Sequence, residues 1–75
     1  MEERMMPFDI LNKSRGKRVI LELKNKKQIA GTLKAWDQHV NIVLDDAEER
    51  EEGETKRTLG TIFIRGDMII FVSPA

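Results

Sequence analysis

Two short clusters of polar residues interrupt the apolar pattern of this sequence, and their side chains suit contact with a flat, polar ring. The first cluster is Asp37-Gln38-His39-Val40-Asn41, and the second is Arg65-Gly66-Asp67. An imidazole and a guanidinium can both stack on a nucleic-acid base, and a carboxamide can hydrogen-bond to its edge. The clusters therefore indicate a base-binding pocket, or else two turns whose polar residues serve only the turn.

Groups that support catalysis are scarce in the rest of the chain. The sequence has one histidine and no cysteine, and its His, Asp and Glu residues lack the spacing of a metal site. It has no glycine-rich phosphate loop, and Ser14 and Ser73 have no neighbouring base. We therefore expect neither an enzyme nor a chain that holds a metal or cofactor.

Length and composition are those of one small domain that spans residues 1–75. Lysine and arginine number 13, balanced by 13 aspartates and glutamates, and 40% of the residues are hydrophobic. The longest apolar run, residues 68–72, is far too short for a membrane span, and the charged start does not resemble a signal peptide. We expect a cytoplasmic protein whose small core favours oligomerisation.

Acidic residues concentrate in the segment 45–54, where seven acidic side chains accompany one basic side chain. Like charges this close repel each other and stay solvated. The pattern predicts an exposed variable loop at about 45–55. A hairpin tip kept soluble by its charges is favoured over a cation-binding site. The remaining residues carry +6 (+4 in residues 1–44 and +2 in residues 55–75), which suits an anionic partner.

A helix and five strands should position the two clusters. Pro7 and Asp9 fit a first helical turn, which predicts a helix at about 7–14 with Phe8, Ile10 and Leu11 on one face. From residue 17 the apolar period becomes two, which predicts strands around 17–24, 29–35, 40–44, 58–64 and 68–72. Glycines inside the second and fourth strands indicate sharp bends. We predict a mostly β fold, in which the short helix precedes a strongly bent, five-stranded antiparallel sheet that forms a small open barrel.

The last predicted strand, residues 68–72, is apolar on both faces. A strand with one buried face would alternate, and an uncovered apolar edge would aggregate. Burial beneath the helix is one explanation, but so small a chain favours pairing with another subunit. Head-to-tail pairing of this kind builds a ring if the rotation closes.

The parity of each cluster predicts where its side chains point. In the cluster 37–41, the polar residues at odd positions lie opposite the core-facing Val40, so they should line one side of a strand entry. Gly66-Asp67 fits the centre of a two-residue hairpin turn between the fourth and fifth strands. Such a turn would hold Arg65 and Asp67 at one tip.

With these motifs in this order, the sequence resembles the Sm and Sm-like protein family, specifically its archaeal members. The first motif spans about 18–46 and contains Asp37-x-His39-x-Asn41, and the second spans about 59–72 and contains Ile64-Arg65-Gly66-Asp67. The resemblance covers nearly the whole chain. It implies the Sm fold, in which subunits join strand four to strand five in a ring, most often of seven, that binds uridine-rich single-stranded RNA around its pore.

The resemblance also implies a role for the residues of both clusters. His39 and Arg65 would sandwich a uracil, and Asn41 would hydrogen-bond to its edge. Asp67 would orient the Asn41 amide, and Gly66 would belong to the same RNA-binding turn.

Three further residues have two interpretations. Asp37 either braces the turn of the RNA-binding site or is a turn residue alone. Trp36, the single tryptophan, either forms a second RNA surface with Arg4 or packs against protein.

We therefore predict a non-catalytic, homo-oligomeric RNA-binding ring that serves as scaffold or chaperone in RNA processing and also contacts other RNA-processing proteins. The alternative is a structural ring module that binds mainly protein partners. The two clusters together favour RNA, because a pure scaffold has no need of His39, Asn41 and Arg65 at once. The spacing does not distinguish a ring of seven from a ring of six.

Overall fold

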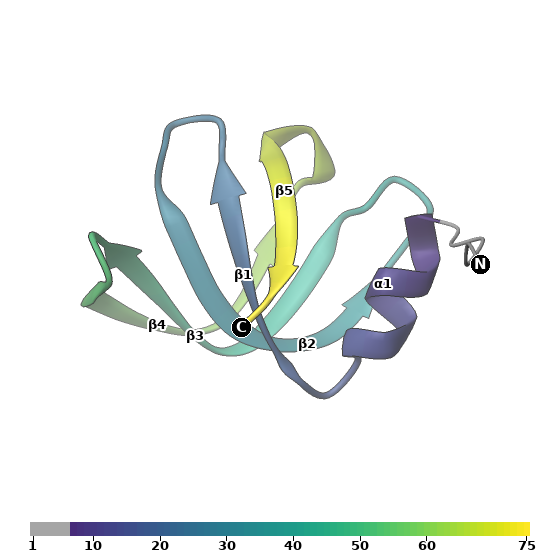
Figure 1. Ribbon diagram of the computed structural model, residues 1–75, viewed down its shortest axis with the longest axis horizontal. Coiled ribbons are helices and arrows are strands. Elements are labelled where there is room, and N and C mark those ends of the chain that lie inside the picture. Colours follow the sequence, from purple (N-terminus) through teal and green to yellow (C-terminus); the bar gives the residue numbers. More distant parts are fainter. Residues whose placement is uncertain (1–6) are drawn as a thin grey trace, which may run out of the picture.

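The computed structural model describes residues 7–75, which form a short helix followed by a curved sheet (Figure 1). In chain order the elements are α1 (Pro7–Ser14), β1 (Arg18–Leu23), β2 (Gln28–Trp36), β3 (Ile42–Glu51), β4 (Glu54–Ile64), the 3₁₀ helix η1 (Gly66–Met68) and β5 (Ile69–Pro74). The predicted helix at 7–14 and the mostly β fold are confirmed.

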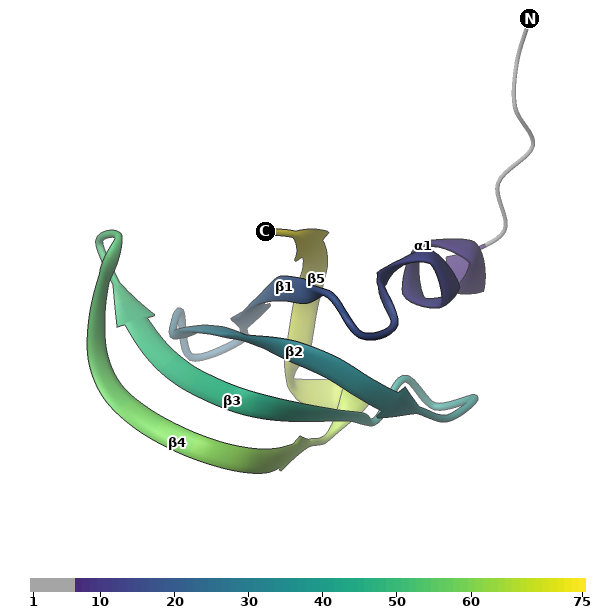
Figure 2. The same ribbon diagram turned by 90° about the horizontal axis from the view of Figure 1, so that it is seen from below.

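The five strands form one antiparallel sheet in the order β4-β3-β2-β1-β5. Figure 2 shows β2, β3 and β4 curving together. At Gly31 in β2, a Cβ would lie 3.0 Å from the Cβ of Leu44, so glycine allows β3 to pass close by. Gly60 in β4 has a φ of +75°, which glycine adopts without strain. Because the pairing register shifts beside both glycines, the predicted bends are confirmed.

The core forms where alternate side chains of β1, β2 and β3 meet inside the curved sheet. The fully buried large side chains are Val19, Leu21, Leu33, Ile42 and Leu44. Since successive strand residues point to opposite faces, this alternation leaves the intervening residues on the outer face of the sheet. The apolar period of two along the sequence thus describes the core correctly.

Helix α1 packs at one end of this core with a narrower face than predicted. Leu11 and Ser14 are buried, whereas Ile10 is 38% exposed. Residues three apart share a helix face, while adjacent residues are separated by about 100°. The expectation that Ile10 and Leu11 share the buried face is therefore wrong. Within residues 7–75, no helix has the length and apolarity needed to cross a membrane.

The predicted acidic loop at 45–55 is wrong, because most of this segment is strand. β3 continues to Glu51 and β4 begins at Glu54, so the turn consists of Glu52 and Gly53, both with positive φ. The segment is a long hairpin whose tip alone is free of strand pairing.

Basic side chains from the hairpin itself and from other parts of the chain offset the repulsion within this hairpin. The ion pairs are Arg18–Glu48, Arg50–Glu48, Lys27–Glu49 and Arg57–Glu49, at 2.9–3.7 Å. The hydrogen bond from Thr55, followed by that from Arg50, lowers the pKa of Glu48. Arg18 and Lys27 are distant in sequence from the acidic run, so the local charge pattern alone suggested a solvated loop.

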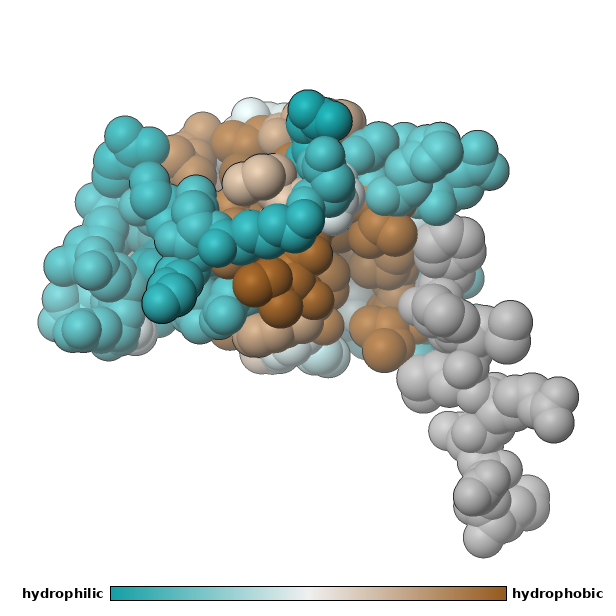
Figure 3. All heavy atoms as spheres, turned by 90° about the horizontal axis from the view of Figure 1, so that it is seen from above, coloured by the Kyte–Doolittle hydropathy of each residue, from teal (hydrophilic) through white to brown (hydrophobic). Residues whose placement is uncertain are grey.

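Strands β4 and β5 lie at opposite edges of the sheet, so residues 66–68 do not form the predicted hairpin. Both edge strands expose large apolar side chains. Phe63 on β4 is 62% exposed, and Ile70 and Phe71 on β5 are 56% and 44% exposed. Figure 3 shows apolar side chains gathered at the middle of one face, with hydrophilic ones around them. Burial of β5 within the monomer, the alternative explanation of its apolarity, is therefore wrong.

Candidate functional site

The segment 37–41 joins β2 to β3 as a closed loop built around one carboxylate. Asp37 Oδ1 accepts hydrogen bonds from the backbone N–H groups of His39 (2.9 Å) and Asn41 (3.1 Å). The Asp37 carbonyl accepts a third from the N–H of Val40 (3.0 Å). Aspartate favours turns because its side chain can bond to the following backbone in this way. Asp37 thus braces the turn, and His39 lies exposed at its tip.

Val40 adopts a backbone conformation that valine rarely takes. Its φ is +62°, and the left-handed region costs an L-residue about 1–2 kcal/mol. The half-buried side chain packs against the hydrophobic core, which offsets this strain. Because β3 begins only at Ile42, the predicted strand alternation through Val40 is wrong.

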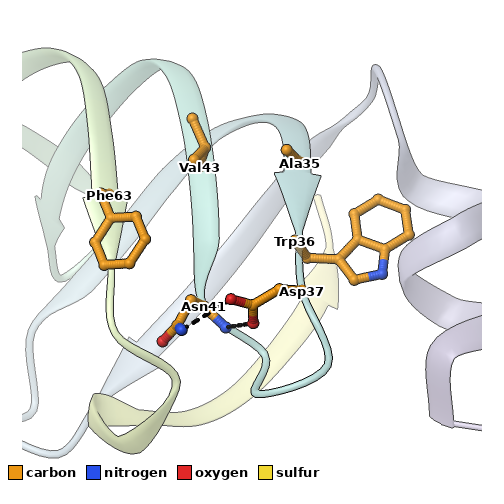
Figure 4. Close-up of a pocket in the computed structure, with 6 residues that line it drawn as sticks. All are labelled: Ala35, Trp36, Asp37, Asn41, Val43 and Phe63. Carbon is orange, nitrogen blue, oxygen red and sulfur yellow. Dashed lines mark hydrogen bonds between the residues drawn. The ribbon is translucent and has the colours of Figure 1, made fainter.

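The side-chain amide of Asn41 is held at both ends. Its Nδ2 donates to Asp37 Oδ2 at 3.0 Å (Figure 4), and its Oδ1 accepts from the backbone N–H of Gly66 at 2.8 Å. A carboxylate accepts and an N–H donates, so turning the amide over would lose both bonds. One Nδ2–H and one lone pair of Oδ1 remain open to a ligand.

Hydrogen bonds also keep the Asp37 carboxylate ionised. The side-chain bond from Asn41, assisted by the backbone N–H groups of Asn41 and His39 and opposed by desolvation, lowers the pKa of Asp37. The ionised form accepts every one of these bonds, so it is the favoured form at neutral pH.

Asp37 therefore orients Asn41, and the prediction that Asp67 does so is wrong. Asp67 Oδ2 instead accepts from Arg65 Nη2 at 3.1 Å across the start of η1. Both side chains are mostly exposed, so this ion pair contributes little to stability by itself. It restrains the Arg65 guanidinium at the surface.

Gly66 brings the two polar clusters together. A Cβ at this position would overlap the carbonyl oxygen of His39 and lie 3.0 Å from the carbonyl carbon of Val40. Glycine alone lets η1 approach the neighbouring backbone this closely. The predicted meeting of the clusters is thus a backbone-to-backbone contact that holds Arg65 beside the loop of His39 and Asn41.

Trp36 ends β2 on the side of the loop that faces α1 (Figure 4). The guanidinium of Arg15 lies 4.6 Å from the centre of its ring, within the range of a cation–π contact. Trp36 is half-buried: part of it packs against the core, as the packing interpretation predicted, and part lies at the surface, where an RNA-binding role stays a prediction. Arg4, its predicted RNA-binding companion, lies outside the described residues.

A shallow hollow beside the amide was missed by the sequence reasoning. It is lined by Ala35, Trp36, Asp37, Asn41, Val43 and Phe63 (Figure 4). Val43 and Phe63 are paired across β3 and β4, on the face opposite the core. In the sequence, each of these residues is apolar although it lies between two core positions of its strand, where alternation predicts a polar residue.

The site offers hydrogen bonds, a cation and planar groups. An amide with a fixed donor and acceptor lies in the same loop as the exposed imidazole of His39 and beside the exposed guanidinium of Arg65. Among residues 7–75, no three His, Asp or Glu side chains lie close enough to hold a metal ion. The arrangement suits the binding of a planar, polar ring by stacking and edge recognition.

Comparison with known proteins identifies one family. The LSM domain family model matches residues 9–74. A snRNP Sm-like protein of Archaeoglobus fulgidus is 49% identical over 69 residues, which cover 92% of this chain and 90% of that protein. A second, from Methanococcoides burtonii, is 46% identical over 68 residues, which cover 91% of this chain and 94% of that protein.

Solved structures agree with this fold. The Sm protein of Pyrococcus abyssii, in complex with a uridine heptamer, is 38% identical and superposes with a TM-score of 0.89 over 95% of this chain and 100% of the other. A heptameric archaeal Sm protein is 42% identical, with a TM-score of 0.80 over 87% of this chain and 94% of the other.

Proposed function

This chain belongs to the LSM domain family, and on that premise we propose that it forms a ring of its own copies that binds uridine-rich single-stranded RNA. The ring acts without catalysis, as a cytoplasmic scaffold or chaperone in RNA processing. The observation that carries the proposal is the Asn41 amide, held in one orientation by Asp37 and Gly66. The complex of the Pyrococcus abyssii relative with a uridine heptamer supports it.

The open positions of the Asn41 amide match the edge of uracil. Uracil presents an N3–H donor beside a carbonyl acceptor, whereas cytosine presents an N3 acceptor beside an amino donor. The Asn41 Oδ1 accepts from N3–H, and the free Nδ2–H donates to O4. Cytosine in the same position would require the amide to turn over and lose its bonds to Asp37 and Gly66.

Stacking supplies the rest of the affinity at each subunit. In the proposal, the imidazole of His39 and the guanidinium of Arg65 contact the two faces of one uracil, and Asp67 restrains Arg65 through their ion pair. Stacking on an aromatic side chain contributes about 1–3 kcal/mol per base. A ring repeats this weak site, and the high effective concentration of linked bases makes the overall binding tight.

The open edges of the sheet supply the ring contacts. In the proposed assembly, β4 of one subunit pairs with β5 of the next, which covers the exposed side chains of Phe63, Ile70 and Phe71. Closure of the ring then leaves no sheet edge free. The heptameric archaeal Sm relative supports a ring of seven.

Trp36 marks a second RNA surface in this proposal. The Arg15 guanidinium against its ring adds a cation that an RNA phosphate can approach. Arg4, the other residue of this proposed surface, lies outside the described residues.

Binding of labelled oligo-U, oligo-C and oligo-A at two salt concentrations tests the proposal. We expect oligo-U to bind most tightly, and Asn41→Ala to weaken oligo-U binding strongly while light scattering still reports the same ring mass. An intact ring that binds the three oligonucleotides equally, or not at all, would reject the uracil site and favour the alternative of a module that binds proteins.

A further inference from the structure

The turn between β1 and β2, residues 24–27, is hydrogen-bonded to the loop that carries Arg65. The backbone N–H of Lys24 donates to the carbonyl of Met68 at 2.8 Å, and the N–H of Met68 donates to the carbonyl of Arg65 at 3.0 Å. Figure 1 shows this turn next to the chain entering β5 along the upper side of the view, with the loop between β2 and β3 farther to the right on the same side. The turn therefore borders the proposed uracil site.

The backbone of this turn is tightly bonded. Lys26 has a φ of +70°, and its N–H donates to the carbonyl of Leu23 at 2.9 Å. The N–H of Lys27 donates to Asn25 Oδ1 at 3.0 Å, and the N–H of Leu23 donates to the Lys27 carbonyl at 2.9 Å. Each lysine side chain therefore starts from a fixed point beside η1.

Two lysines of the turn are not engaged by acidic groups. Lys27 pairs with Glu49 at 3.7 Å, but Lys24 and Lys26 are exposed and make no ion pair with any residue of the described range 7–75. Unpaired ammonium groups concentrate positive potential at this place in a chain whose net charge is zero.

The acidic hairpin borders the other side of the turn and restricts where an RNA strand can lie. Gln28 pairs with Arg50, so the tip of the hairpin, residues 51–54, follows next to the turn in the sheet. Both ribbon views place the turn between this tip and the Arg65 loop (Figures 1 and 2). An RNA strand is repelled by the tip and attracted by the turn, so it should follow the turn toward η1.

We propose that Lys24 and Lys26 bind the phosphates of the RNA strand whose uracils occupy the Asn41 site, an inference that rests on the proposed function. Each lysine offers a compact ammonium with three donors and no planar face, which suits a phosphate oxygen and not a base. The two lysines add affinity and salt dependence without adding base preference.

The salt dependence of oligo-U binding tests this inference. The double variant Lys24→Gln/Lys26→Gln is compared with the parent chain between 50 and 200 mM salt. The slope of log affinity against log salt is negative, and each lost phosphate contact on a single strand reduces its magnitude by about 0.7, so two lost contacts reduce it by about 1.4. We expect affinity at 50 mM salt to fall about tenfold, with an unchanged preference for oligo-U over oligo-C.

Lys13 and Lys17 supply the matched control. They are also exposed and unpaired within residues 7–75, but they precede β1, whereas Lys24 and Lys26 follow it. Lys13→Gln/Lys17→Gln removes the same charge at the opposite end of this strand and should leave the slope closer to that of the parent.

Three outcomes overturn the inference in distinguishable ways. If the parent binds oligo-U and the Lys24/Lys26 variant keeps its slope, the phosphate contacts are absent and the proposed function stands. An equal loss in both double variants indicates a non-specific effect of net charge. If the parent does not bind oligo-U, the proposed function fails, and the phosphate contacts fail with it.

Discussion

The backbone N–H of Gly66 donates a hydrogen bond to the side-chain oxygen of Asn41, which joins two loops that lie 25 residues apart in the chain. The opposite end of the same amide donates to Asp37 within its own loop. One amide is thus oriented by a local bond and a long-range bond, and each can be removed separately by mutation.

Replacement of Asp37 should reduce discrimination between uracil and cytosine. Asp37→Asn keeps a turn-forming side chain, but it places an NH₂ group where the carboxylate accepted from Asn41. Base-edge hydrogen bonding discriminates by about 1–3 kcal/mol, so we expect the ratio of oligo-U to oligo-C affinity to fall about tenfold. Fluorescence anisotropy with both oligonucleotides measures this ratio.

Asp67→Asn is the matched control for Asp37→Asn. Because Asp67 contacts Arg65 and not Asn41, its loss should weaken binding of both oligonucleotides alike. If Asp67→Asn lowers the ratio more than Asp37→Asn does, the assignment of the orienting carboxylate to Asp37 is wrong.

Acidification should release the Asn41 amide only at low pH. The bonds from Asn41 and His39 lower the pKa of Asp37 in the folded protein. A lowered pKa means that these bonds stabilise the fold fully above the unfolded value of about 3.9 and lose this effect as the pH falls through the lower folded value. The side-chain NH₂ signal of Asn41, followed by NMR in pH steps, should therefore stay constant down to about pH 4. A change centred well above that pH would contradict the role of ionised Asp37.

Addition of a methyl group at Gly66 should strongly weaken uracil binding. In Gly66→Ala, the Cβ overlaps the carbonyl oxygen of His39, so η1 must move away and its N–H leaves Asn41. We expect at least a tenfold loss of oligo-U affinity and a loss of stability of about 1–3 kcal/mol, measured by urea unfolding. Gly53→Ala is the control, because a Cβ at Gly53 would meet open space, while its positive φ still makes alanine unfavourable there. Its variant should lose stability without losing affinity, and equal losses of affinity would reject the contact model.

A charge at either sheet edge should dissociate the ring. Phe63→Lys on β4 and Ile70→Lys on β5 each place an ammonium in the proposed subunit contact, where its desolvation is unfavourable. Light scattering after size exclusion should change from about seven chains of 8.7 kDa to monomers that retain β structure. Ile10→Lys, at an exposed apolar position on α1, should keep the ring. A monomeric parent at micromolar concentration would show that the ring itself is wrong.

Local chemistry allowed much of this fold to be predicted from the sequence. The helix at 7–14, the apolar period of two and the glycine bends depend on backbone preferences and on which faces exclude water, and each appears in the structure. The two polar clusters were also recognised correctly as neighbours in space, although by resemblance more than by spacing.

Tertiary structure alone decided the contacts within the site and the paths of the charged segments. Two aspartates flank the site, and residue type does not distinguish them. The closed loop brings Asp37 to the Asn41 amide, whereas Asp67 contacts Arg65. The acidic run 45–54 is mostly strand, where Arg18, Lys27 and Arg57 from outside the run pair with its Glu48 and Glu49. Gly66 approaches His39 because Ile64 at the end of β4 pairs with Ile42 at the start of β3, which places the chain after β4 beside the loop before β3. These contacts depend on which strands pair and in what register across the whole sheet, and residue type and parity along one strand do not specify its partner.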